Sequence, residues 1–311
     1  MFSAAVQPAL VSLFSSTGSE PLTLFSSHVD KSLPSDSCIC LLEDSTSLPP
    51  PPPPAILVAV DSAREQVSQA DRTEYVLNQT VLHIQSPSLQ TTYIRCPPAG
   101  WSRSGGSLRM RTGDLGIEHP WIHLQVRNLQ REWSFEVGVV DRSGREGIVR
   151  CSTFQVYMPH PCRRVCRHIT RAHHLAARRR RRGDPFSHKE PQLKLGKRPL
   201  LHLPLNFPPP SSNPLTCWST ITLNLPQFLP HFSSASMARR VPHEDDAAHD
   251  ESSTSSDVPH VSSRPIAVPS GGYSHVSYVK VYATCRLRHI FFTENGPRQE
   301  LPWEFGLYSA D

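Results

Sequence analysis

The chain has 311 residues, and Pro accounts for 31 of them, roughly double its ordinary usage. Charged residues make up 19% and hydrophobic residues 38%, a balance that predicts a moderate core with Pro-rich, polar segments and excludes a highly charged disordered chain. The net charge of +5 is concentrated in residues 161–198, which hold 13 Arg or Lys and two acids, so the rest of the chain is net negative.

The same composition sets expectations for the compartment. The apolar run at residues 55–60 is too short to span a bilayer, which needs roughly 20 residues. The N-terminus lacks the positive region of a signal peptide. We therefore expect an intracellular protein without a membrane partner, whose eight cysteines are free thiols.

The first strand signals follow a hexaproline tract at Pro49–Pro54, which is typical of polyproline II. Apolar and polar residues alternate in residues 81–84, 92–96 and 121–126. The clearest pattern begins at Trp133, because Trp133, Phe135, Val137 and Val139 recur with a period of two and share one face of a strand. Residues 141–144 form a turn signal, and residues 147–154 read as the return strand of a hairpin.

The second half of the chain alternates between strand patterns and low-complexity stretches. Further strands are expected at residues 200–203, 218–225, 278–285 and 287–293, followed by a short aromatic segment at 300–305. These strands are enough for two packed antiparallel sheets, so the predicted fold class is all-β, an antiparallel β-sandwich. Long disordered insertions are expected at residues 30–72, 98–113, 157–197 and 233–272.

No catalytic pattern emerges from the sequence. Gly-x-Ser-x-Gly, a Gly-rich phosphate loop with Lys and His-Glu-x-x-His are all absent, so we expect no enzyme activity and no cofactor. Cys162, Cys166 and His168 invite a zinc interpretation, but they crowd into one Arg-rich stretch and lack the second ligand pair, a dozen or more residues away, that zinc sites usually have. We therefore expect no metal.

The most conspicuous charge feature is a run of five arginines: Arg178, Arg179, Arg180, Arg181 and Arg182. Such a run could bind RNA or nucleoprotein, act in nuclear import or contact acidic tubulin tails. It also fits a solvated loop, because no aromatic residues interleave with it to stack on bases. Non-specific polyanion binding is expected in either case.

Four tryptophans offer a third interpretation. Trp121, Trp133, Trp218 and Trp303 could line a sugar-binding face of a β-sandwich. Trp133 shares its face with Phe135 and Val137, a pattern more typical of a core residue.

The patterned segments, taken in order, resemble the cilia- and flagella-associated protein 20 family, also called the basal-body up-regulated family. Residues 91–97 (Thr-Thr-Tyr-Ile-Arg-Cys-Pro) are similar to a family signature, and residues 218–228 are similar to another family block. The strongest block is residues 285–292 (Cys-Arg-Leu-Arg-His-Ile-Phe-Phe), followed by Glu-Leu-Pro-Trp-Glu-Phe at residues 300–305. Each motif is weak alone, and their shared order carries the resemblance.

The resemblance implies one family domain, a jelly-roll-like sandwich without catalytic residues. Its core would comprise residues 1–25, 80–97, 115–155, 198–232 and 276–308, interrupted by the four insertions named above. The abrupt change of composition at these insertions also fits retained introns or gene-model errors, which continuous splicing in transcripts would exclude.

The resemblance further implies residence at the axoneme and basal body of a cilium or flagellum, at the inner junction of doublet microtubules. Tubulin and the Parkin co-regulated gene product would be the partners there, and some family members are linked to the nucleus. Arg286, Arg288 and His289 lie on one predicted strand, and we expect them to form a partner-facing set.

Overall fold

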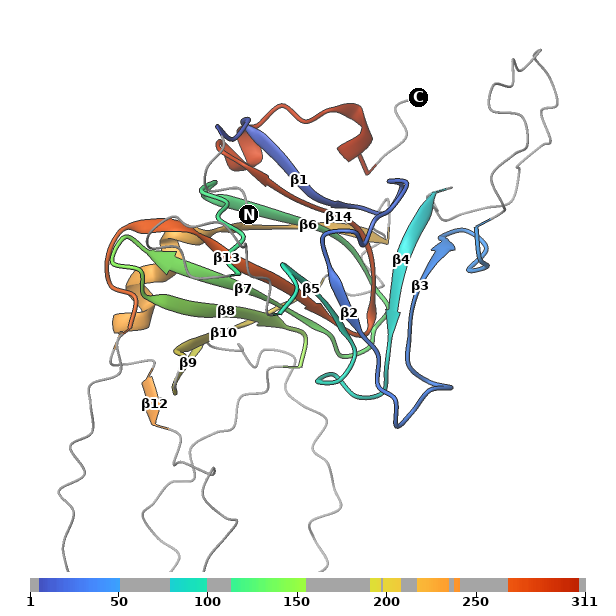
Figure 1. The fold of residues 1–311 in the computed structure, drawn as a ribbon, viewed down its shortest axis with the longest axis horizontal. Helices are drawn as coiled ribbons and strands as arrows, with labels where there is room; N and C mark the ends of the chain where they lie inside the picture. The colour runs from blue at the N-terminus through green and yellow to red at the C-terminus, as the bar shows by residue number, and fades with distance from the viewer. Residues whose placement is uncertain are drawn as a thin grey trace, which may run out of the picture.

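A computed structural model describes residues 6–50, 79–99, 113–154, 191–196, 198–207, 217–234, 238–240 and 268–307. It consists of two β-sheets packed face to face, so the predicted all-β sandwich is confirmed (Figure 1). The helical elements among these residues are short 3-10 turns, and none has the length or hydropathy to cross a membrane.

Sheet I is centred on β14, which pairs with three other strands. Its strand order is β11-β6-β14-β4-β3, and β1 also pairs with β14. On the side away from β6, β4 pairs with residues 285–287 of β14, and β1 pairs with residues 289–293. The strands are β1 (Leu10–Ser15), β3 (Cys38–Glu43), β4 (Thr80–Gln85), β6 (Trp121–Asn128), β11 (Trp218–Asn224) and β14 (Cys285–Thr293).

Sheet II has the order β12-β9-β10-β8-β7-β13-β5-β2. The β10–β8 and β12–β9 pairs are parallel, so the expectation of purely antiparallel sheets is wrong at these two places. The strands are β2 (Ser26–His28), β5 (Tyr93–Cys96), β7 (Ser134–Asp141), β8 (Glu146–Ser152), β9 (Gln192–Leu195), β10 (Leu200–Pro204), β12 (Ala238–Arg240) and β13 (Tyr273–Tyr282). The described residues also form 3-10 turns at η2 (Leu225–Ser233), η3 (Gly296–Arg298) and η4 (Trp303–Phe305).

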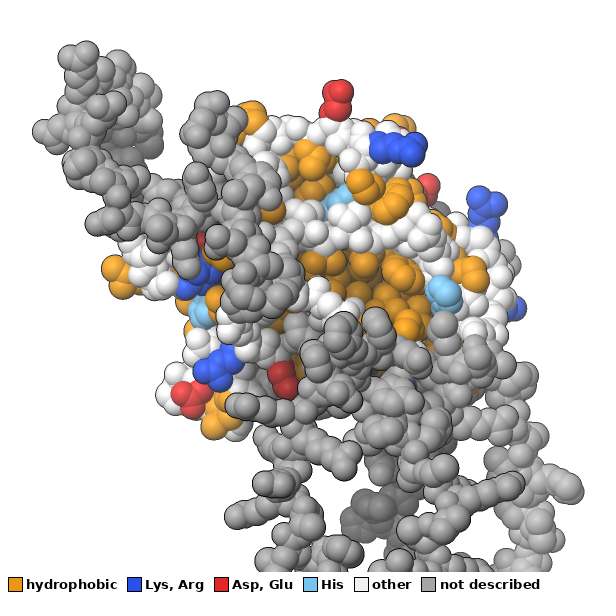
Figure 2. Space-filling view, turned by 180° about the vertical axis from the view of Figure 1, so that it is seen from behind, with side chains coloured by type: hydrophobic (Ala, Val, Ile, Leu, Met, Phe, Trp, Pro, Cys, Tyr) orange, Lys and Arg blue, Asp and Glu red, His pale blue; other side chains and the backbone are white. Residues whose placement is uncertain are grey.

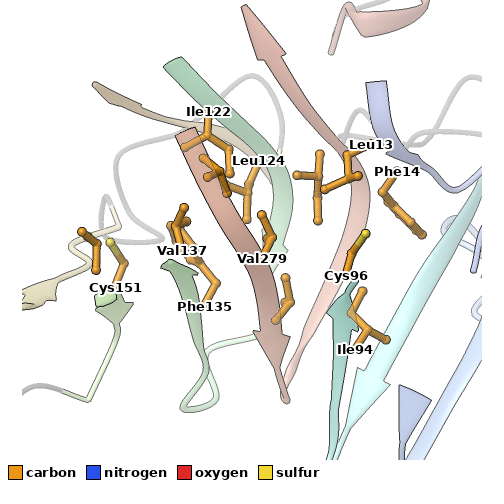
Figure 3. Packing of buried hydrophobic residues seen from close by; sticks show 14 of the residues in the cluster. Leu13, Phe14, Ile94, Cys96, Ile122, Leu124, Phe135, Val137, Cys151 and Val279 are labelled. Carbon is orange, nitrogen blue, oxygen red and sulfur yellow. The ribbon is translucent and has the colours of Figure 1, made fainter. Parts of the chain in front are cut away.

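The two sheets enclose a continuous hydrophobic core. In Figure 3, Leu124 of β6 lies across from Val137 of β7, and Val279 of β13 and Cys96 of β5 extend the cluster. The last two long strands join the layers, because only Ala283 and Thr284 separate β13 in sheet II from β14 in sheet I (Figure 1).

The hairpin predicted from the period of two is confirmed. Trp133, Phe135, Val137 and Val139 are fully buried in the core, and β8 returns antiparallel to β7. At the turn, Gly144 has φ +76°, a backbone conformation that favours glycine. Burial would raise the pKa of the Asp141 carboxyl, but backbone N–H groups of Ser143, Arg145, Ser270 and Gly271 hydrogen-bond to it and hold the pKa below its ordinary value.

Three of the expected insertions include ordered strands. Residues 30–72 contain β3, residues 157–197 contain β9, and residues 233–272 contain β12, so disorder was the wrong prediction for these strands. β3 is ordered, although it lies close to the Pro tract, because Ile39 and Leu41 pack against the core. Most other residues of the four insertions lie outside the described ranges, and the division into family core and insertions stays a prediction.

Some hydrophobic side chains at the margins of the core are only partly buried. Ile221 and Leu223 of β11 pack against the core but are only partly buried, as are Leu205 and Phe207 after β10. Figure 2 shows the side of the molecule opposite that of Figure 1, and hydrophobic side chains gather in the middle of this face.

Candidate protein-binding site on the C-terminal segment

The outer face of sheet I owes its polar character to a β-bulge in β14. Leu287 is opposite Val126 and His289 is opposite Gln125, which leaves Arg288 as the extra residue. Leu287 and Ile290 therefore both point into the core, whereas Arg288 and His289 both lie on the outer side. A strict alternation would have placed one of these two polar side chains in the core.

The outer side of β14 is covered, so the expected partner-facing set is wrong. Arg286, Arg288 and His289 have relative exposures of 8%, 3% and 3%. The alternation in the sequence identified the face correctly, but it could not show that chain segments from residues 44–47 and 303–307 lie over that face. These three side chains hold those segments in place.

Arg286 belongs to a buried charge cluster around Asp44, which follows β3. Its Nη1 lies 2.6 Å from Asp44 Oδ1, and Arg127 Nη1 lies 3.0 Å from the same oxygen. Trp218 Nε1 donates to Asp44 Oδ2 at 2.8 Å, and Arg286 Nη2 donates to Ser47 Oγ at 2.6 Å. The Asp44 side chain is completely buried and that of Arg286 is 9% exposed, whereas that of Arg127 is 22% exposed. One carboxylate thus serves two guanidinium groups, and the cluster keeps a net positive charge.

Arg288 holds the C-terminal segment 303–307. Its Nη1 donates to the carbonyl of Gly306 at 2.5 Å, and its Nη2 donates to that of Glu304 at 2.9 Å. Gln125 Nε2 donates to the carbonyl of Phe305 at 2.6 Å, and Gln125 Oε1 accepts from Arg288 Nη1 at 3.2 Å. Three consecutive carbonyls of the segment are thus bound by two side chains of sheet I, which fixes its position over the sheet.

Phe305 provides the apolar anchor of the segment. It is buried, with its ring centroid 4.9 Å from that of His289 and 4.7 Å from that of Phe291. Phe291 in turn stacks on His123 at 4.6 Å, and His123 Nε2 and Nδ1 hydrogen-bond with Thr293 and Thr222. Burial lowers the pKa of His123 to about 4, and burial together with the neighbouring Arg288 charge lowers the pKa of His289 to about 4.

These histidines predict a loss of stability in acid. Burial also lowers the pKa of His202 in sheet II to about 4, so three histidines stay neutral in the folded chain but take up a proton near pH 6.5 once unfolded. Because the unfolded state binds more protons, stability falls as the pH drops from about 6.5 towards 4, by ~2 kcal/mol for each histidine at pH 5. Urea unfolding at pH 7.5 and pH 5 tests this. The His123→Gln variant should show a shallower decline, and a wild type equally stable at both pH values would contradict the assignment.

The anchored segment presents one large apolar side chain to solvent. Trp303 is 87% exposed, whereas Phe305, two residues away, is buried. Leu301 and Pro302 beside it are exposed, as are the carboxylates of Glu300 and Glu304. Because several hydrogen bonds already hold this segment, ordering it on binding costs little conformational entropy. Tryptophan is also enriched at the centres of protein interfaces.

The four tryptophans do not share a face. Trp133 lies in the core, Trp218 donates to Asp44, and the Trp121 ring packs over Gly296. Trp303 alone of the four is exposed. The interpretation as a sugar-binding face therefore finds no common surface on which a ring could stack.

Among the described residues, the pair that most resembles a catalytic one is Ser152 and His202 in sheet II. Ser152 Oγ lies 2.6 Å from His202 Nε2, but Ser152 is fully buried and His202 nearly so. Within the same described ranges, no three His, Cys, Asp or Glu side chains come together as metal ligands. Among the described cysteines, Cys38, Cys40, Cys96, Cys151 and Cys285 are free thiols.

Sequence reasoning missed the residues that make this site. Asp44 follows β3, a strand that was not predicted because its segment lies close to the Pro tract. The exposure of Trp303 depends on contacts between residues far apart in the sequence. Arg178, Arg179, Arg180, Arg181 and Arg182 lie outside the described residues, as do Cys162, Cys166 and His168, so their roles stay predictions.

Comparison with known families identifies one domain. Residues 64–165 match the model of the CFA20 domain, a range that includes β4, β5, β6, β7 and β8. No curated protein matches the chain. The match confirms the resemblance drawn from the sequence, and residues 64–165 carry a CFA20 domain, consistent with the cilia- and flagella-associated protein 20 family.

Proposed function

We propose that the chain is a non-enzymatic structural protein of ciliary or flagellar axonemes, acting at the inner junction of doublet microtubules and at basal bodies. The CFA20 domain at residues 64–165 carries this proposal, because it indicates a cilia- and flagella-associated protein. The finer assignment to the inner junction follows the family resemblance of the blocks at residues 91–97 and 285–305. In this role the protein supports cilium assembly and motility.

The proposed mechanism is mechanical. A cross-link between microtubule components needs a body that resists deformation and surfaces that bind two partners at once. Two features support this: β14 is buried along its whole length, and Arg288 and Gln125 hold the segment bearing Trp303 on sheet I. Tubulin and the Parkin co-regulated gene product are the proposed partners, and the Trp303 segment is the proposed contact with one of them.

A non-enzymatic role agrees with the polar groups of the sandwich. Arg286, Arg288 and Asp44 use their charges on one another or on neighbouring segments. The Ser152–His202 pair lacks access to a substrate, and burial lowers the pKa of its histidine to about 4, which makes it a weak base.

Co-sedimentation with axonemes tests the proposal. The purified full chain is incubated with axonemes from cells that lack their own family member, and the pelleted fraction is measured. The wild type should pellet saturably, and Trp303→Ala should weaken binding by about tenfold or more, as expected when a central aromatic residue of an interface is removed. Leu33→Ala removes another exposed hydrophobic side chain and should bind like the wild type.

The two parts of the proposal fail separately. A wild-type chain that stays in the supernatant contradicts axonemal binding. A Trp303→Ala variant that pellets like the wild type leaves axonemal binding intact and removes the C-terminal segment from the interface.

A further inference from the structure

A row of charged residues crosses the outer face of sheet II. Arg95 of β5 is opposite Lys280 of β13, Lys280 is opposite Glu136 of β7, and Glu136 is opposite Arg150 of β8. His202 of β10 continues the row beside Arg150. Residues that are opposite in register lie on the same side of a sheet, and the residues that alternate with them are buried in the core.

Positive charge exceeds negative charge in this row. Its one carboxylate, Glu136, is buried and accepts hydrogen bonds from Arg150 Nε at 2.7 Å, from Arg150 Nη2 and from the Tyr278 hydroxyl at 3.2 Å. Arg95 and Lys280 are like charges on directly opposed positions, an arrangement that destabilises a sheet. Burial lowers the pKa of Lys280, and the charges of Arg95 and Arg150 lower it further against the opposing effect of Glu136.

The neighbouring positions on this face do not supply the missing negative charge. On one side, Tyr278, Gly138, Ile148 and Leu200 are opposed in register across four strands, and none is charged. On the other side, Tyr93 is opposite Tyr282, and Ser134, Ser152 and Pro204 continue that row. The rows directly beside the charged row thus carry no charge from β13 to β10. One row farther, Glu146 of β8 accepts from the Ser277 hydroxyl at 2.7 Å and lies 3.6 Å from Arg198, so it already has a cationic partner. Within the described residues, cations therefore exceed carboxylates in the charged row.

The tyrosines hold the cations at defined positions. Lys280 Nζ lies 3.5 Å from the Tyr93 ring centroid and 4.4 Å from that of Tyr282, and Arg95 Cζ lies 4.8 Å from that of Tyr278. Ring faces attract cations without neutralising them. Arg95 and Lys280 are half-buried, and the Arg150 side chain is 31% exposed, so all three reach the surface.

We propose that this face of sheet II binds an acidic polypeptide segment, with Arg95, Lys280 and Arg150 as its cationic contacts. The cations lie in a line across strands about 5 Å apart, and an extended chain repeats its side chains on one side about every 7 Å, so alternate Asp or Glu residues can reach successive cations. The inference concerns sheet II and holds whether or not the chain acts in cilia.

Phosphate-based ligands fit this face less well. Backbone N–H groups within a sheet are engaged between strands and cannot cradle a phosphate. Base stacking needs open aromatic rings, but Tyr278 and Tyr282 are buried and Tyr93 is covered by Lys280 and His28.

Binding of a fluorescein-labelled ten-residue oligoglutamate, followed by anisotropy, tests the proposal. All proteins are full-length and carry Ser in place of Arg178, Arg179, Arg180, Arg181 and Arg182, which removes the other polyanion-binding candidate. Arg95→Gln with Lys280→Gln should weaken binding by about tenfold or more. The control, Lys31→Gln with Arg298→Gln, loses the same charge from exposed positions and should bind like its parent.

Two further measurements decide the outcome. Glu136→Gln removes the one carboxylate of the row and should strengthen oligoglutamate binding, and thermal unfolding of each variant establishes that it is folded. Equal binding by the folded double variant and its control would overturn the proposal. Tighter binding of oligothymidine that depends on the same residues would overturn it in favour of a nucleic-acid surface.

Discussion

Replacing Asp44 by asparagine is expected to lower the free energy of unfolding by about 3–5 kcal/mol. The substitution keeps the shape of the side chain but removes the counter-charge that Arg127 and Arg286 share, and the Arg286 side chain is only 9% exposed. Trp218 would also lose a charge-assisted acceptor for its indole N–H. Chemical denaturation at neutral pH, monitored by tryptophan fluorescence, measures the loss.

The matched control is Asp36→Asn, which removes the same charge from an exposed position. Its free energy of unfolding should stay within about 0.5 kcal/mol of the wild type. If Asp44→Asn were as stable as this control, the cluster would not stabilise the outer layer of sheet I.

Replacing Phe305 by alanine is expected to cost about 3 kcal/mol and to release the C-terminal segment from sheet I. The ring packs against His289 and Phe291, and its removal leaves a cavity beneath the segment. Hydrogen exchange over residues 300–307 should become faster, while β14 keeps its pairing with β6. Trp303 would then no longer be held in a defined position.

The Trp303→Ala variant tests whether the exposed side chain contributes to holding the segment on sheet I. Because the Trp303 side chain is exposed, its removal should change stability by less than about 0.5 kcal/mol and leave the exchange rates of the segment unchanged. Equal destabilisation by Trp303→Ala and Phe305→Ala would show that the segment is not organised as described.

The sequence predicted those parts of the fold whose signals are local. The period of two from Trp133 to Val139 placed four side chains in the core, and the turn signal at residues 141–144 placed the hairpin. Residues 287–293 were correctly expected to form a strand, which in the structure begins two residues earlier, at Cys285. In each case the pattern extends over enough residues to exclude a helix.

The remaining features depend on contacts that no local pattern records. β3 is six residues long and adjoins the Pro tract, so its pairing with β4 was hidden. The bulge at Arg288 breaks the alternation, and the covering of Arg286, Arg288 and His289 comes from residues more than 200 positions earlier and from the C-terminal segment. Of the predicted partner-facing set, Arg288 and His289 support the segment that bears Trp303, and Arg286 holds residues 44–47.

Localisation with functional rescue tests the central claim most directly. The chain is tagged, expressed in a ciliated cell that lacks its own family member, and imaged beside an axonemal marker while ciliary beating is scored. An axonemal protein predicts signal along the shaft and at the basal body, with restored beating. Signal confined to the nucleus without restored beating would contradict the account and favour the RNA- or nucleoprotein-binding interpretation of the arginine run.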